Sequence, residues 1–201
     1  MATTRPVTDN EYLDILDHCD GDLATRDRCL IVQLREWGPR ISEALSLRVG
    51  QVLDQGQVLH DVSIPASAVK TRRGYIAHLN DTARRWMARW LAEGSEHGHM
   101  AADSFVFHVR ESTRRPMSPK SAWAMIQKAA KAKGAGLIGS IGPHSFRKAY
   151  GLWVYRASGN DIMAAKEALR HESLESTRKY LRIEADRVKA LILGHSVAMR
   201  E

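Results

Sequence analysis

The chain has 201 residues, of which 44% are apolar and 26% charged, a composition typical of a folded globular protein and unlike that of a disordered one. Thirty lysines and arginines oppose 23 acidic residues, so the formal net charge is +7. This basic balance is compatible with a nucleic-acid-binding surface, although charge alone does not establish one.

The N-terminal part of the chain is predicted to form two helices. Thr8 is expected to cap a helix over residues 8–19, in which apolar side chains recur on one side. A second helix is expected over residues 23–37. Gly38-Pro39 then ends this helix and gives the chain a new start.

A strand region is predicted next, within an otherwise helical chain. Residues 52–79 contain β-branched runs separated by two turn-like segments, which predicts a small three-stranded antiparallel sheet. Helical patterns occur over residues 81–93, 119–133, 143–157, 160–169, 174–181 and 184–199. Because no repeat or long linker interrupts this order, the sequence predicts one α+β, mainly helical domain over residues 1–201.

The cysteine pattern and the N-terminus indicate a cytoplasmic protein. Cys19 and Cys29 are the only cysteines and form no paired framework, so we expect reduced, mostly buried thiols. The N-terminus has no apolar signal core, and no stretch approaches the length of a membrane span. His97-Gly98-His99 has no third ligand at a sensible spacing, so we expect a solvated loop there and no metal site.

Two Gly-Pro pairs each place basic residues in the opening turn of a predicted helix. Free N–H groups and the helix dipole favour a phosphate at such a turn. Arg40 follows the first pair, and Glu43, on the same helix face, is expected to orient its guanidinium. His144 and Arg147 follow the second pair and are again one turn apart. A surface ion pair and a solvated face are the alternatives, and the repetition favours phosphate binding.

Lys70 lies between two of the predicted strands, beside the turn that contains Arg72 and Arg73. One interpretation is a basic hairpin tip that only aids solubility. The other is a tip that enters a DNA groove, where the Lys70 ammonium can give its proton to a leaving oxygen. Lys70 fits that role better than the two arginines because a guanidinium does not yield its proton.

Tyr180 is the candidate nucleophile. It lies off the apolar stripe of the helix predicted over residues 174–181, on the side of Ser176 and Thr177. A core tyrosine would share the leucine face of that helix, so this placement favours exposure to a polar cleft. His171, nine residues upstream, is a second candidate for phosphate contact.

This ordered set resembles the catalytic residues of the tyrosine recombinase (phage integrase) family. The set is Arg40, Lys70, His144-x-x-Arg147 and His171-x8-Tyr180. The similarity runs from residue 8 to just beyond the tyrosine, and Ile41-Ser42-Glu43 fits the segment of the first family arginine. At Leu169-Arg170-His171, however, Arg170 replaces the usual glycine, which either alters the turn before the histidine or adds a phosphate contact.

The resemblance implies a site-specific recombinase that cuts and rejoins DNA without a metal or another cofactor. Tyr180 would attack the phosphorus and form a 3′-phosphotyrosine, which conserves the bond energy for rejoining. Arg40 and Arg147 would hold the non-bridging oxygens, and His171 would add a hydrogen bond. His144 would assist proton removal from the tyrosine.

Further roles follow from the same resemblance. Lys70 would protonate the departing 5′ oxygen. Additional DNA contacts are expected from Arg72, Arg73, Lys148 and Arg170. The outcome would be integration, excision, inversion or resolution.

The resemblance also implies an assembly on double-stranded DNA. Arg40 comes too early for an N-terminal core-binding domain, so the layout is similar to catalytic-domain-only members such as the fimbrial-switch invertases. We expect a homotetramer on DNA whose C-terminal segment, residues 184–201, is exchanged between protomers. An accessory DNA-binding protein and a nucleoid-associated location in the cytoplasm are also expected.

Three other functions fit parts of the pattern. A type IB topoisomerase-like enzyme uses a similar residue set to nick and reseal DNA. A DNA-binding regulator could keep the fold without catalysis, although the complete set argues against decay. A basic RNA-binding or ribosome-associated protein ranks last because no aromatic-rich strand motif occurs.

Overall fold

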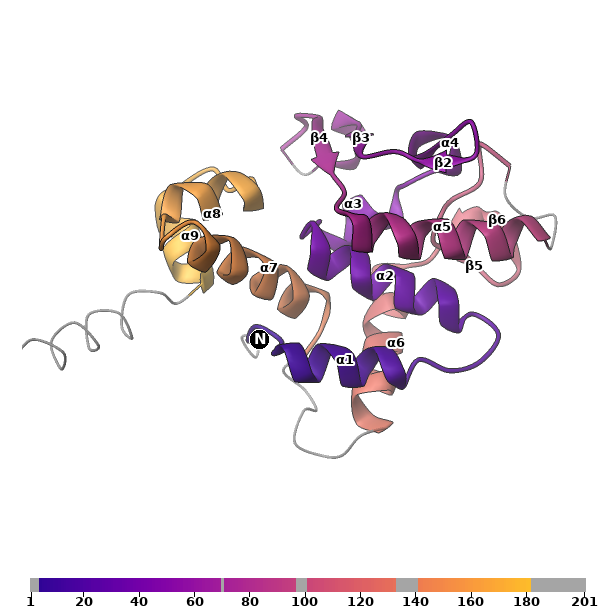
Figure 1. Cartoon of the computed structure of the whole chain (residues 1–201), viewed down its shortest axis with the longest axis horizontal. Coiled ribbons are helices and arrows are strands. Elements are labelled where there is room, and N and C mark those ends of the chain that lie inside the picture. Colours follow the sequence, from indigo (N-terminus) through magenta and orange to yellow (C-terminus); the bar gives the residue numbers. More distant parts are fainter. Residues whose placement is uncertain (1–3, 70, 97–100, 133–140, 182–201) are drawn as a thin grey trace, which may run out of the picture. The chain divides into compact units, whose positions relative to one another are not determined.

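The computed structural model describes residues 4–69, 71–96, 101–132 and 141–181. The chain divides into two compact units, Met1–Tyr150 and Gly151–Glu201, with the boundary inside one helix (Figure 1). None of the helices in these described ranges is long and apolar enough to span a bilayer. The fold is mainly helical with small antiparallel sheets, which confirms the predicted class.

The first unit contains all the described strands and the longer helices. Its helices are α1 (Asp9–Asp17), α2 (Ala24–Glu36), α3 (Ile41–Leu45), α4 (Val49–Val52), α5 (Asp81–Glu96), α6 (Pro119–Ala132) and the first part of α7 (Pro143–Ala157). Its strands are β1 (Leu53–Asp54), β2 (Gln57–Val58), β3 (Asp61–Ile64), β4 (Tyr75–His78), β5 (His108–Val109) and β6 (Ser112–Pro116). The second unit contains the end of α7, α8 (Ile162–Leu169) and α9 (Leu174–Leu181).

These bounds confirm most of the predicted helices to within a few residues. The short helix α4 was not predicted, because a four-residue helix leaves no periodic signal. The helix predicted over residues 184–199 and the segment 97–99 lie outside the described residues.

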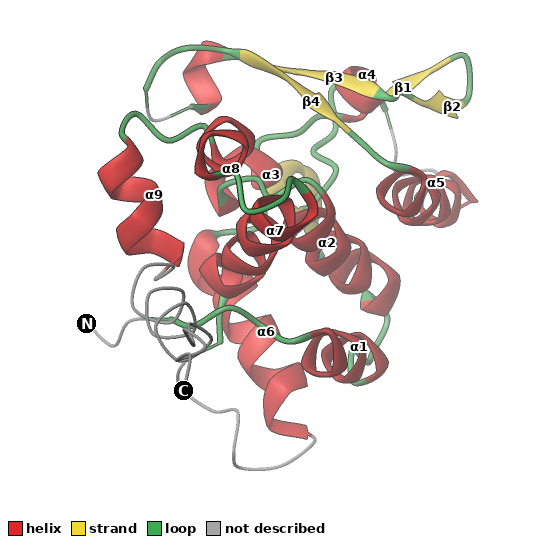
Figure 2. Ribbon diagram, turned by 60° about the vertical axis from the view of Figure 1, so that its left-hand side comes forward, coloured by secondary structure: helices red, strands yellow, loops and turns green. Residues whose placement is uncertain are grey.

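The predicted three-stranded sheet is wrong in its strand pairing. In the described part of the chain, β1 pairs with β2 and β3 pairs with β4, each as a separate two-stranded antiparallel sheet (Figure 2). A third pair, β5 with β6, was not predicted. β1 and β2 have only two residues each, below the usual strand length, so they form one short hairpin.

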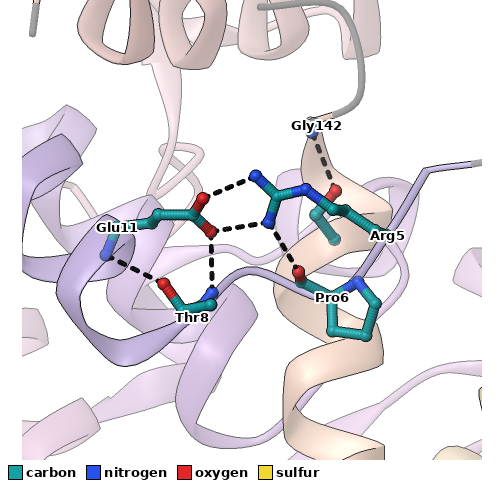
Figure 3. Close-up of polar contacts among 6 residues, drawn as sticks. Arg5, Pro6, Thr8, Glu11 and Gly142 are labelled. Carbon is teal, nitrogen blue, oxygen red and sulfur yellow. Dashed lines mark hydrogen bonds and ion pairs between the residues drawn. The ribbon is translucent and has the colours of Figure 1, made fainter. Parts of the chain in front are cut away.

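A capping box starts α1, as the predicted Thr8 cap requires. Thr8 Oγ1 accepts from the Glu11 N–H at 3.3 Å, and Glu11 Oε2 accepts from the Thr8 N–H at 2.9 Å. Arg5 then forks onto both carboxylate oxygens of Glu11, at 2.7 and 2.5 Å (Figure 3). Val7, which precedes Thr8 in the chain, is buried. It donates its N–H to Ser145 O at 3.3 Å, so the N-terminal segment is bound to the start of α7.

Helix α2 of the first unit packs against α5 and contacts α3. Its buried Gln33 donates to Ala83 O on α5 at 2.9 Å and accepts from Trp37 Nε1 at 2.9 Å, so the amide has partners on both sides. Cys29 on the same helix is fully buried, and Cys19 is 5% exposed. Burial raises the pKa of both thiols, that of Cys19 to about 12.

The second unit is held by close contact between α7 and α8 and between α8 and α9. A Cβ at Gly151 on α7 would lie 2.6 Å from the Leu169 side chain, so any larger residue would require Leu169 to shift. Asp161 caps α8 by accepting from the Met163 N–H at 2.7 Å.

Candidate active site

Arg40 and Glu43 form the ion pair that the sequence predicts, at the start of α3. Arg40 is the N-cap residue, and its Nη1 donates to Glu43 Oε1 at 2.9 Å. Its backbone N–H donates to Glu43 Oε2 at 2.8 Å. The carboxylate is completely buried, whereas 23% of the Arg40 side chain is exposed. The buried acid therefore holds the guanidinium in place while part of it faces solvent.

Arg147 is held next to this pair by a backbone contact. It is 2% exposed, and its Nη1 donates to the carbonyl oxygen of Gly38. Gly38 has φ +59°, and a Cβ there would lie 2.2 Å from the Tyr150 ring, so only glycine fits. The turn that leads into Arg40 is thus seated directly against α7, and both predicted arginines belong to one packed cluster.

His144 lies in the first turn of α7, within the electric field of that cluster. The surrounding chain removes part of its hydration although the side chain is exposed at the surface. This desolvation, together with the positive charges of Arg147, Lys148 and Arg40, lowers the pKa of His144 below 6.5. The ring is therefore predominantly neutral at pH 7, and a neutral imidazole is able to accept a proton.

The predicted DNA contacts differ in exposure. Arg72 and Arg73 are exposed, and Arg72 sits at φ +53° in a turn closed by its N–H to Val69 O at 2.9 Å. Lys148, in contrast, is 5% exposed, and its ammonium donates to Thr4 O at 2.5 Å. Lys148 therefore fastens the N-terminal segment in this structure instead of reaching out from α7.

His171 is positioned within the second unit by α9. Its Nδ1 is 3.1 Å from Thr177 Oγ1. Thr177 is fully buried, and the same hydroxyl donates to Ser173 O at 3.3 Å. Arg170 adopts the left-handed conformation, with φ 52° and ψ 46°, that the usual glycine would take. The arginine thus keeps the helix-ending turn at the expense of backbone strain, and it donates Nη1 to Ala168 O at 3.1 Å.

The structure brings some of the predicted residues together and leaves others undescribed. Arg40, Glu43, His144 and Arg147 form the cluster in the first unit, while His171 belongs to the second. The backbone of Tyr180 lies on α9, but its side chain is outside the described part. Lys70 is also outside the described residues. The roles proposed for Lys70 and Tyr180 stay predictions.

Three positioning contacts escaped the sequence analysis. Tyr75 OH donates to Glu43 Oε2 at 3.0 Å, across 32 positions of the chain. Thr177, assigned to the polar side of its helix, is in fact buried against His171. Gly38 was interpreted as a helix breaker, without its contact to Arg147. Only the Gly-Pro pair at residues 38 and 39 marked one of these positions, because long-range hydrogen bonds have no local sequence pattern.

The chain matches one family model over most of its length. Residues 5–187 match the profile of the phage integrase family. The chain belongs to this family. Tyrosine recombinase XerD of Corynebacterium glutamicum is 30% identical over 188 residues, and that of Chlorobaculum tepidum is 29% identical over 189. These alignments cover 90% and 91% of the chain but 57% and 59% of the two relatives.

Two solved recombinase structures share the fold. The XerA recombinase matches with a TM-score of 0.72 at 17% identity, covering 98% of this chain and 68% of that one. The XerH site-specific recombinase, bound to its palindromic difH substrate in a post-cleavage complex, matches with a TM-score of 0.69 at 19% identity. This second match covers 94% of the chain and 52% of XerH.

Proposed function

We propose that the chain is a site-specific DNA recombinase that cuts and rejoins DNA strands through a covalent 3′-phosphotyrosine at Tyr180. The observation that carries this proposal is the contact of buried Arg147 with Gly38, immediately before the Arg40–Glu43 pair. Two guanidiniums anchored in one packed cluster are suited to binding the two non-bridging oxygens of a phosphodiester. Membership of the phage integrase family supports the same chemistry.

The arginine cluster would supply charge stabilisation to the proposed reaction. Negative charge builds on the non-bridging oxygens as a nucleophile attacks phosphorus, and preorganised donors stabilise it best. Glu43 and Gly38 hold the two guanidiniums before substrate arrives. These contacts reduce the side-chain freedom that the two arginines lose when the phosphate binds. Arg147, at 2% exposure, becomes accessible to the phosphate only when the residues that cover it move.

Proton transfers complete the proposed reaction. His144, held predominantly neutral by its surroundings, accepts the proton of Tyr180 as its oxygen bonds to phosphorus. The bond from phosphorus to the 5′ oxygen breaks, and Lys70 protonates that oxygen. His171 donates a further hydrogen bond to the phosphate. The reverse reaction, attack by a 5′ hydroxyl of another strand, releases the tyrosine and reseals the DNA.

The proposed partner is double-stranded DNA, with the protein acting as a homotetramer. Exchange of residues 184–201 between protomers and an accessory DNA-binding protein are parts of the same proposal. Arg72, Arg73 and Arg170 are proposed to contact the DNA backbone. The net charge of +7 supports binding to a polyanion.

A covalent-trapping experiment tests this function. The protein is incubated with supercoiled DNA that carries the sequences flanking its own gene, and adducts are separated under denaturing conditions. The wild type should form an adduct whose peptide contains Tyr180, whereas Tyr180→Phe should bind the same DNA without an adduct. Tyr12→Phe, which removes a hydroxyl from a ring packed edge-on against Phe146, is the control and should behave as wild type. An adduct formed by Tyr180→Phe would refute the assignment.

A further inference from the structure

A tyrosine on the β3–β4 hairpin contacts the carboxylate that orients Arg40. Tyr75 OH donates to Glu43 Oε2 at 3.0 Å. The same oxygen accepts the Arg40 N–H at 2.8 Å, and the other accepts Arg40 Nη1 at 2.9 Å. Hairpin, acid and arginine therefore form one hydrogen-bonded chain.

The burial of Glu43 makes this contact matter. Its side chain is completely inaccessible to solvent, so water does not replace a hydrogen bond that is lost. A hydroxyl that donates to one carboxylate oxygen limits rotation of the carboxylate plane, and that plane fixes the direction of the Arg40 fork. Without the hydroxyl, the carboxylate loses a donor that does not belong to Arg40, so the acid and the guanidinium can shift as a pair.

The tyrosine hydroxyl is presented by a well-fixed piece of backbone. Tyr75 is the first residue of β4 and pairs with Ile64 on β3. The preceding Gly74 packs so closely that a Cβ there would lie 2.8 Å from Ile64 O. The backbone of Tyr75 is thereby held by β3, so its hydroxyl approaches Glu43 from an element other than α3.

We infer that Tyr75 is a positioning residue for DNA cleavage, which acts on Arg40 through Glu43. This inference rests on the proposed function and adds a residue to it. Tyr75 does not touch the phosphate in this scheme. Its hydroxyl keeps the Arg40 guanidinium aligned with the non-bridging oxygens, so its loss slows the chemical step and leaves DNA affinity nearly unchanged.

The experiment compares Tyr75→Phe with wild type on a nicked DNA duplex that contains the mapped cleavage site. Tyr75→Phe should reduce the single-turnover rate of adduct formation about 10-fold. The DNA dissociation constant should change less than about 2-fold, because positioning acts on the chemical step. Tyr12→Phe is the matched control and should keep the wild-type rate.

A second background separates positioning from a structural role. In an Arg40→Ala protein, Tyr75→Phe should slow cleavage no further, because the group that it positions is gone. In an Arg40→Lys protein, which keeps a cation beside Glu43, Tyr75→Phe should likewise slow cleavage no further. A merely structural contact would lower stability and slow cleavage by the same factor in all three backgrounds.

The outcomes are distinguishable from failure of the proposed function. If wild type forms no adduct, the recombinase proposal itself is wrong. If wild type forms the adduct and Tyr75→Phe forms it equally fast, only the role of Tyr75 is refuted. An equal rate loss in the Arg40 variants also refutes it.

Discussion

The guanidinium of Arg147 donates to the carbonyl oxygen of Gly38, two residues before Arg40. The part of α7 up to Tyr150 and the turn into α3 are therefore packed together, although more than 100 residues separate Arg147 from Gly38 in the chain. A displacement of this turn moves one arginine and removes the anchor of the other. Phosphate binding by Arg40 and by Arg147 should consequently be lost together.

Substitution of Gly38 tests that coupling. Gly38→Ala forces a Cβ to within 2.2 Å of the Tyr150 ring and places alanine at φ +59°. We expect a loss of about 3 kcal/mol in the free energy of unfolding, from backbone strain and overpacking together. Urea denaturation measures the loss, and adduct formation should fall with it.

Gly21→Ala is the control for this prediction. Gly21 has φ +80°, and nothing lies within 4 Å of a Cβ built there, so the substitution introduces strain without a clash. We expect a loss of about 1 kcal/mol and unaltered cleavage. Equal losses for both variants would show that the Tyr150 contact is unimportant.

The lowered pKa of His144 predicts a pH dependence of stability. The unfolded chain takes up a proton at this histidine near pH 6.5, while the folded protein does so only at lower pH. The unfolded state therefore binds more protons between the two pKa values, and stability falls as pH decreases below 6.5. Above that pH the effect is absent.

His144→Gln isolates this effect from other titrating groups. The unfolding free energy of wild type minus that of the variant, measured by denaturant titration over a pH range bracketing 6.5, should decrease toward acid. A flat difference would contradict the lowering of the His144 pKa by desolvation and by the charges of Arg147, Lys148 and Arg40. An increase toward acid would indicate a stabilised imidazolium instead.

Arg170 offers a test of backbone strain beside a candidate catalytic histidine. Arg170→Gly should raise the unfolding free energy of the second unit by about 1 kcal/mol, because glycine adopts φ 52° without strain. Arg170→Ala removes the side chain but keeps the strained conformation. If the two variants are equally stable, the left-handed geometry is not the source of strain.

Lys70 is predicted to act on the leaving group. Lys70→Ala should slow cleavage of ordinary DNA about 100-fold, as loss of a general acid does. DNA with a 5′-bridging sulfur at the cleaved bond should restore the rate, because a thiolate departs without a proton. Arg147→Ala should show no such recovery. Equal recovery of both variants would contradict the assignment of the proton to Lys70.

Local patterns predicted the helices well and the sheets poorly. Thr8 and the two Gly-Pro pairs act through the residues next to them, so their helix starts could be identified from sequence. Strand pairing depends on which strands the tertiary fold brings side by side. In the described residues, these are β1 with β2, β3 with β4, and the unpredicted pair β5 with β6.

The site was predictable to a similar extent. Arg40 with Glu43, and His144 with Arg147, each lie within one helical turn, so spacing alone indicated that they share a face. The contact of Tyr75 with Glu43 joins elements 32 residues apart and follows from the fold. The burial of Lys148 likewise depends on the N-terminal segment that accepts its hydrogen bond.

The burial of both native thiols has a practical consequence for following this protein on DNA. Cys29 is fully buried and Cys19 is 5% exposed, with a pKa raised to about 12, so neither forms much thiolate at neutral pH. Maleimide dyes should therefore not label the unmodified chain. A single cysteine introduced at exposed Trp153 would take the dye selectively, without prior removal of either native cysteine.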